Sequence, residues 1–201
     1  MKNIKKLICA VLTTTMIFGL TACASKDFNH TKLVDFCNDQ DFEDCDEPED
    51  FIIAFGNISN HRIEGEGFYI NDTKGDAQDL YDKVVNRFND YPSYDIIETT
   101  TFGYSDKGQL TLVFLLTFEE TKDAEKFYKK YSRDFADDGE SGQEKGYSYS
   151  IEIGDGPSGK DMLSGVYLRG NTVLVIRSLT KDSDLVEDLC KAYKIISPLE
   201  A

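Results

Sequence analysis

Residues 94–118 read YDIIETTTFGYSDKGQLTLVFLLTF, and this stretch decides the fold. Two runs, Tyr94–Tyr104 and Leu110–Phe118, flank the polar sequence SDKG, which is typical of a turn between antiparallel strands. In the second run, positions 110, 112, 114, 116 and 118 are all apolar, and the intervening positions are half apolar. Apolar side chains on both faces predict a central strand, in a sheet that helices cover on one or both faces.

Further strands are predicted on the C-terminal side of this hairpin. From Gly146 to Ile153, Tyr and Ile alternate with Ser and Glu, which is the pattern of a strand with one face in water. The apolar runs Leu163–Leu168 and Thr172–Leu179 are separated by Arg169-Gly170-Asn171, where Gly supplies the positive φ that a tight turn needs. Sequential hairpins of this kind predict an antiparallel sheet.

Amphipathic helices are predicted around these strands, because apolar residues recur at helical spacing after Thr, Ser or Asp. The predicted helices are Thr31–Asp39, Asp76–Phe88, Thr121–Phe135 and Ser183–Tyr193. We expect the short apolar runs Phe51–Phe55 and Gly67–Ile70 to be strand-like or held in turns, and residues 137–146 to form a flexible polar loop. The prediction is an α+β fold, in which amphipathic helices pack on an antiparallel sheet of hairpins within one domain of residues 30–201.

Three of the predicted helices begin alike, with TKGDA at 73–77, TKDA at 121–124 and TKDS at 180–183. Between Asp76–Asp90 and Asp123–Asp137, six of fifteen aligned positions are identical. The later two helices also follow hairpins, so the pattern suggests a duplicated hairpin–helix module. The alternative is convergence, because Thr and Asp both cap the free N–H groups of a first turn.

The N-terminus has the layout of a signal peptide. Lys2, Lys5 and Lys6 form a positively charged start, and an apolar stretch runs from Leu7 to Leu20. This stretch is shorter than the ~20 apolar residues that a membrane-spanning helix needs. The small residues that follow it are typical of a cleavage site for a signal peptidase.

The sequence Leu20-Thr21-Ala22-Cys23 resembles the lipobox of bacterial lipoproteins. The resemblance implies cleavage before Cys23 and attachment of diacylglycerol to its thiol, which would anchor the chain on the outer face of the cell membrane. It implies a signal peptide of residues 1–22, a lipidated Cys with a short tether over residues 23–29, and an extracytoplasmic domain over residues 30–201. Two acyl chains suffice for stable anchoring. The alternative is a secreted protein with Cys23 as a free N-terminal thiol.

The balance of charge limits the partners. The 201 residues carry a formal net charge of −15, and removal of residues 1–22, which contain three Lys and no acidic residue, changes it to −18. Nucleic acid is excluded as a partner, because phosphate binding requires a basic face. Anionic lipid head groups would repel the domain, so membrane attachment depends on the diacylglycerol at Cys23. A basic envelope protein or a cation remains as the expected partner.

Three further cysteines lie in the predicted domain: Cys37, Cys45 and Cys190. Cys37 and Cys190 lie on apolar faces of predicted helices, and disulfides persist outside the cytoplasm. We therefore predict a Cys37–Cys190 bridge between the first and last helices, with Cys45–Cys190 as the competing pair. The alternative is that all three are buried thiols, which pack as small apolar groups. Their spacing matches no zinc site.

Two motifs resemble ligand sites but carry features that argue against this role. The sequence GDGPSGKD at 154–161 resembles a P-loop, yet Asp161 stands where a hydroxyl would hold Mg²⁺, and a predicted strand follows instead of a helix. We therefore expect no bound nucleotide. The acidic run Asp39–Asp50 offers carboxylates to Ca²⁺, but it lacks EF-hand spacing and contains Pro48. A solvated run of charge is the alternative.

No catalytic constellation is recognisable. His30 and His61 have no neighbouring partner pattern, and the chain contains neither a G-x-S-x-G nor an H-E-x-x-H motif. We predict no catalytic, cofactor-binding or metal-binding residues, and a non-catalytic binding or protein-interaction domain. An extracytoplasmic hydrolase is one alternative, because 37 acidic residues offer many carboxylate pairs. A small-ligand-binding lipoprotein is the other.

Overall fold

The computed structural model describes residues 27–60, 65–73, 75–86, 92–106, 109–156, 159–179 and 183–201. The predicted signal peptide, Cys23 and His61 lie outside these ranges. The helices are α2 (His30–Asp39), α3 (Pro48–Ser59), α4 (Gly75–Leu80), the π-helix η1 (Tyr81–Val85), α5 (Thr121–Phe135), α6 (Asp184–Tyr193) and the 3-10 helix η3 (Pro198–Glu200). The strands are β1 (Glu43–Asp44), β2 (Glu66–Thr73), β3 (Ile96–Asp106), β4 (Gln109–Phe118), β5 (Glu140–Glu144), β6 (Tyr147–Asp155), β7 (Asp161–Arg169) and β8 (Thr172–Ser178).

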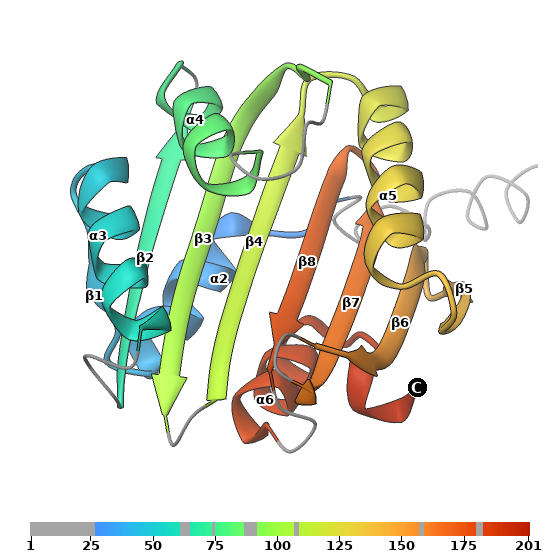
Figure 1. Cartoon of the computed structure of the whole chain (residues 1–201). Helices are drawn as coiled ribbons and strands as arrows, with labels where there is room; N and C mark the ends of the chain where they lie inside the picture. The colour runs from blue at the N-terminus through green and yellow to red at the C-terminus, as the bar shows by residue number, and fades with distance from the viewer. Residues whose placement is uncertain are drawn as a thin grey trace, which may run out of the picture.

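The strands form one eight-stranded sheet in the order β1-β2-β3-β4-β8-β7-β6-β5 (Figure 1). Neighbouring strands are antiparallel except for β1 and β2, which are parallel. Strand β4 pairs with β3 on one side and with β8 on the other, so the predicted central strand is confirmed. The predicted α+β class and both predicted hairpins are confirmed as well.

Helices cover both faces of the sheet because β4 and β8 are apolar on both faces. On the back face, α2 and α6 bury Leu33 and Leu189 against Leu115 and Ile176. On the front face, α5 buries Phe127 against the alternate side chains of β4 and β8, and α3 and α4 cover β2 and β3 beside it. Figure 1 shows α4 and α5 lying across this near face of the sheet. The domain therefore has three layers, with the sheet in the middle.

Two sequence-based predictions are wrong. Residues 51–55 belong to helix α3, because Pro48 stands at its start and Glu49 and Asp50 in its first turn favour a helix N-terminus. Residues 140–144 are not a loop but the edge strand β5, which pairs with β6 although four of its five residues are exposed. The apolar run of α3 is too short to separate helix from strand by its spacing, and β5 has little apolar pattern.

The structure does not confirm the predicted duplication. Helices α5 and α6 both follow hairpins, but α5 buries Phe127 on the front face and α6 buries Leu189 on the back face. The third member of the proposed repeat differs again, since α4 continues into the π-helix η1. A side-chain cap is present at the start of α6, where the Ser183 hydroxyl accepts from the N–H of Val186, whereas the N-cap of α5 is Glu120, whose side chain makes no capping hydrogen bond.

The described chain begins at a fixed place on the back face. Phe28 is buried against Tyr147 and Tyr193, and its N–H donates to the Thr172 hydroxyl at 2.8 Å. The Tyr193 hydroxyl donates to the carbonyl of Asn29 at 2.7 Å. Asp27, the first described residue, accepts a hydrogen bond at 3.3 Å from the N–H of Asn171, in the turn between β7 and β8. Across the described segments, none of the helices combines the length and hydropathy needed to cross a bilayer.

Candidate functional site

A row of polar side chains crosses the front of the sheet where the strands are otherwise apolar. Strand register places Glu152 of β6 opposite Ser164 of β7, and Ser164 opposite Arg177 of β8. Arg177 in turn lies opposite Leu112 of β4, so the row changes from polar to apolar in the middle of the sheet. Cross-strand neighbours of this kind have their side chains within contact distance on one face.

Helix α5 ends directly above this row. Its C-terminal end is held on β6, because the Ser150 hydroxyl donates to the carbonyl of Ala136 at 3.0 Å. Phe135, the last residue of α5, lies 4.1 Å from the Arg177 guanidinium, measured from Cζ to the ring centroid. Nη2 of the same guanidinium donates to Met162 Sδ at 2.8 Å. Helix α5 therefore covers apolar side chains of the front face, and the row of Glu152, Ser164 and Arg177 lies beyond its end.

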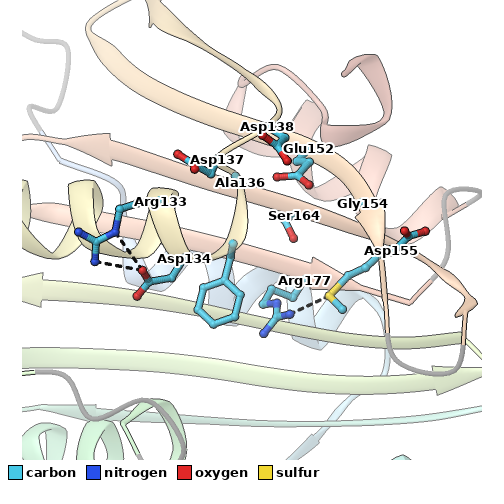
Figure 2. Close-up of a pocket in the computed structure, with 12 residues that line it drawn as sticks. Arg133, Asp134, Ala136, Asp137, Asp138, Glu152, Gly154, Asp155, Ser164 and Arg177 are labelled. Atoms are coloured by element: carbon cyan, nitrogen blue, oxygen red, sulfur yellow. Dashed lines mark hydrogen bonds and ion pairs between the residues drawn. The ribbon is translucent and has the colours of Figure 1, made fainter.

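The uncovered row lines a cavity of about 260 Å³, which we call the acidic pocket (Figure 2). Five carboxylates and two guanidinium groups surround it, a formal net charge of −3. Arg133 is paired with Asp134 at 3.1 Å, but in the described part of the chain no Lys or Arg forms an ion pair with the other four carboxylates. The twelve lining residues are Arg133, Asp134, Phe135, Ala136, Asp137, Asp138, Glu152, Gly154, Asp155, Met162, Ser164 and Arg177.

Ser164 gives this pocket its most specific feature. Its side chain is buried, with 5% of the residue exposed, and its hydroxyl has no hydrogen-bond partner among the described residues. Figure 2 shows the Ser164 oxygen directed into the space between Glu152 and Arg177. The Ser164 hydroxyl is not among the fully enclosed polar atoms that have no partner, so it reaches the space of the pocket and can hydrogen-bond to a group held there (Figure 2). Together with the Glu152 carboxylate, this hydroxyl can accept hydrogen bonds from a cationic donor.

A second cavity of about 200 Å³ continues along the front face from the acidic pocket. We call it the apolar groove, and its lining residues are Phe55, Leu110, Leu112, Met162, Arg177, Ser178 and Leu179. Met162 and Arg177 line both cavities, so the two share a wall. A carboxylate-rich cavity and an apolar cavity therefore lie next to each other where the front helices leave the sheet open.

The structure places the predicted cysteines away from both cavities. Cys37 and Cys190 lie buried in the back core, Cys45 is half-buried near β1, and the structure draws no bridge among the three. Burial raises the pKa of the Cys190 thiol to about 12, and burial with the nearby acidic run raises the pKa of Cys45 to about 11. Protonated thiols are poor nucleophiles, so this chemistry argues against a catalytic cysteine. The Cys37–Cys190 bridge stays a prediction, which a mass gain of two hydrogens on reduction would confirm.

His30 is also buried on the back face, at the start of α2. Its Nδ1 is hydrogen-bonded to the Thr100 hydroxyl at 2.7 Å, and its Nε2 to the Thr117 hydroxyl at 2.8 Å. Burial lowers the pKa of His30 to about 3, and burial raises the pKa of Glu98, whose carboxylate lies 3.9 Å from Nε2. The imidazole is therefore a neutral, hydrogen-bonded part of the core, a role that the sequence alone did not indicate.

Of the two motifs that resemble ligand sites, the P-loop-like sequence contributes Gly154 and Asp155 to the lining of the acidic pocket, and the acidic run contributes no lining residue. The P-loop-like sequence connects β6 to β7, and the segment after it is the strand β7, which leaves no helix N-terminus for phosphates. The acidic run Asp39–Asp50 covers the end of α2, the strand β1 and the start of α3. In the ranges that the structure describes, no group of three or more His, Cys, Asp or Glu side chains is arranged to hold a metal ion.

Sequence reasoning did not identify Glu152, Ser164 or Arg177 as site residues. The sequence does mark one of them. Arg177 is the only charged residue of β8, and it lies on the same face of the strand as Val173 and Val175. A charged residue in an otherwise apolar strand predicts either an end of the covered face or a functional position. Which of these applies depends on where α5 ends above the sheet.

Comparison of the chain with protein-family models, curated proteins and solved structures finds no match.

Proposed function

We propose that this chain is a lipid-anchored, non-catalytic binding domain on the outer face of a bacterial cell membrane, and that its acidic pocket receives a cationic group of a basic protein partner. The observation that supports the proposal is a pocket of net charge −3 into which the Ser164 hydroxyl is directed, beside the Glu152 carboxylate (Figure 2). A cationic donor would satisfy this hydroxyl and compensate the carboxylates around it.

The position of the pocket supports this arrangement. If Cys23 carries the lipid, the four residue steps from Cys23 to Asp27 span at most ~14 Å, so the turn between β7 and β8 lies close to the membrane. Arg177 lies about 17 Å further along β8 from Thr172, at ~3.4 Å per residue. The pocket would therefore lie toward the far end of the domain, where a partner can reach it.

The lipid anchor is tested by fractionation of cells that express the full chain. We expect Cys23→Ser to move the protein from the membrane fraction to the soluble fraction, because removal of the acylated thiol leaves only a domain that anionic lipid repels. Cys45→Ser is the matched control and should leave the protein in the membrane fraction. Equal membrane association of both variants would contradict lipid anchoring at Cys23.

The binding role is tested by site-specific photo-crosslinking in intact cells. A photoreactive residue in place of Asp155, at the rim of the pocket, should give a cross-linked partner. The matched control carries the same residue in place of Asp188, an exposed position on α6. The cross-link at position 155 should weaken when Glu152→Gln is added. No cross-link at position 155, or an equal one at position 188, would contradict the proposed site.

A further inference from the structure

We infer that the partner presents an extended peptide segment in which a Lys or Arg residue is followed, two positions later, by a large apolar residue. This inference rests on the proposed function and adds the apolar groove to it. The basic side chain enters the acidic pocket, and the apolar side chain fills the groove beyond Met162 and Arg177. The shared wall is the feature that joins two cavities into one bipartite site.

Each of the two cavities, taken separately, has room for one side chain. The acidic pocket measures about 260 Å³ and the apolar groove about 200 Å³. Each is smaller than the about 300–1,000 Å³ that is usual for small-molecule pockets. Two small adjoining cavities of opposite chemistry suit two neighbouring side chains of one polypeptide.

The spacing of the strands sets the distance between the two groups. Ser164 and Leu112 face each other across β8, with Arg177 between them in the register. Two strand spacings of ~4.8 Å separate them, about 10 Å in total. In an extended peptide, residues i and i+2 lie on the same side about 7 Å apart, and the flexible length of a Lys or Arg side chain supplies the remainder.

Arg177 determines which end of the site takes the positive charge. Its guanidinium stacks on Phe135 and donates to Met162, so it forms a fixed positive wall between the cavities. A second positive charge is repelled from this wall and attracted to the Glu152 side, where the unpaired carboxylates lie. The groove side offers Leu110, Leu112 and Leu179, which favour apolar groups.

The test uses the full-length lipidated chain in lipid nanodiscs and three fluorescent, end-capped peptides. The first peptide repeats Lys-Thr-Leu-Thr, the second replaces each Leu by Thr, and the third replaces each Lys by Glu. Fluorescence anisotropy should show the Lys–Leu peptide binding about tenfold more tightly than the Lys-only peptide, as expected for burial of one Leu side chain. The Glu–Leu peptide should not bind.

Variants then assign each half of the peptide to its cavity. Glu152→Gln should weaken both Lys peptides about threefold, and Leu110→Gln should weaken only the Lys–Leu peptide. Arg177→Met should tighten the Lys-only peptide, because a repulsive charge is removed. The matched controls are Glu187→Gln and Ile53→Gln, exposed residues of α6 and α3 that line neither cavity. Thermal unfolding checks each variant, and Leu179→Gln replaces Leu110→Gln if the latter does not fold.

The outcomes separate this inference from the proposed function. Equal affinity for the Lys–Leu and Lys-only peptides, with both weakened by Glu152→Gln, would overturn the bipartite site but leave the cation pocket. Binding that is insensitive to Glu152→Gln, or no binding of any peptide, would overturn both. Weakening by the Glu187→Gln control equal to that by Glu152→Gln would assign the affinity to net charge alone, which overturns both as well.

Discussion

The two faces of the sheet show the same strands used in two different ways. On the back face, α2, α6 and the chain around Phe28 cover the sheet, and the hydroxyls of Thr100 and Thr117 hold the imidazole of His30. On the front face, α5 ends at Phe135, and the strands beyond it carry Glu152, Ser164 and Arg177. Around His30 the back face is closed by packing, whereas the front face beyond the end of α5 is open.

Hydrogen bonding separates the faces in the same way. In the described part of the chain, six buried side-chain polar atoms have no hydrogen-bond partner. Arg169 Nε lies on the back side, and the others belong to strands or helices of the front side: Asp72 Oδ2, Tyr81 OH, Ser105 Oγ, Ser132 Oγ and Arg177 Nε. Since unsatisfied polar atoms cost stability, their concentration on one side indicates a side that is not optimised for stability alone.

The largest effect is expected from adjacent residues of β8 that face opposite ways. Ile176→Ala removes a fully buried side chain from the back core and should lower the free energy of unfolding by about 2–5 kcal/mol. Arg177→Met on the front face should change it by less than about 1 kcal/mol, because an apolar side chain of similar volume replaces a half-buried cation without a carboxylate partner in the described chain. Urea unfolding measures the free energy of unfolding of both variants. An equal decrease for Ile176→Ala and Arg177→Met would contradict the view that the two faces of β8 differ in their contribution to stability.

A smaller effect is expected from pH, through His30. Its pKa is about 3 in the folded domain and about 6.5 when unfolded, so only the unfolded chain takes up a proton as the pH falls below 6.5. Stability is therefore complete above pH 6.5 and should fall by about 1 kcal/mol between pH 7 and pH 5.5. Glu98 opposes this trend, because its raised pKa favours proton uptake by the folded state.

The contribution of His30 is isolated by comparing the wild type with His30→Gln, which cannot be protonated in this range. Urea unfolding at pH 7 and pH 5.5 should show a weaker loss for the variant, by about 1 kcal/mol. Identical pH dependence in the two proteins would mean that His30 is not held neutral in the core.

The smallest effect distinguishes two buried serines on the front side. Ser150→Ala should lower the free energy of unfolding by about 1 kcal/mol, because it removes the hydrogen bond to the carbonyl of Ala136. Ser164→Ala should change it by less than about 0.5 kcal/mol, because no hydrogen bond is lost, and it should weaken the Lys-only peptide. If Ser164→Ala proved as costly as Ser150→Ala, the Ser164 hydroxyl would have a partner in the fold, and the assigned site would lose its basis.

Much of the fold was predictable because strand patterns are local. The central position of β4, the pairing of both hairpins and the helical spacing of α5 and α6 agree with the structure, whereas β6 does not keep the predicted wet face, since Ser150 is buried and Ile153 is exposed. Helix α3 was missed because its run of apolar residues is too short to separate helix from strand by spacing. Strand β5 was missed because pairing with β6, rather than its own composition, makes it a strand.

The candidate site was less predictable, because it depends on relations between distant segments. Glu152, Ser164 and Arg177 come from three strands, and only their register brings them into one row. Neither the acidic composition nor the predicted lipid anchor at Cys23 indicates this row. Conversely, the predicted cysteine pair and the acidic run are prominent in the sequence but lie away from the row.

By itself, the sequence determined the hairpins, the central strand, the amphipathic helices and the acidic net charge, because these follow from local periodicity and composition. It also predicts an anchored, extracytoplasmic domain through its N-terminus. The tertiary structure decided which polar side chains have a hydrogen-bond partner in the protein and which face a pocket. His30 and Ser164 are both buried polar residues, yet one is enclosed by hydroxyls and the other faces a pocket, because packing of α2 and α5 on opposite faces sets their surroundings.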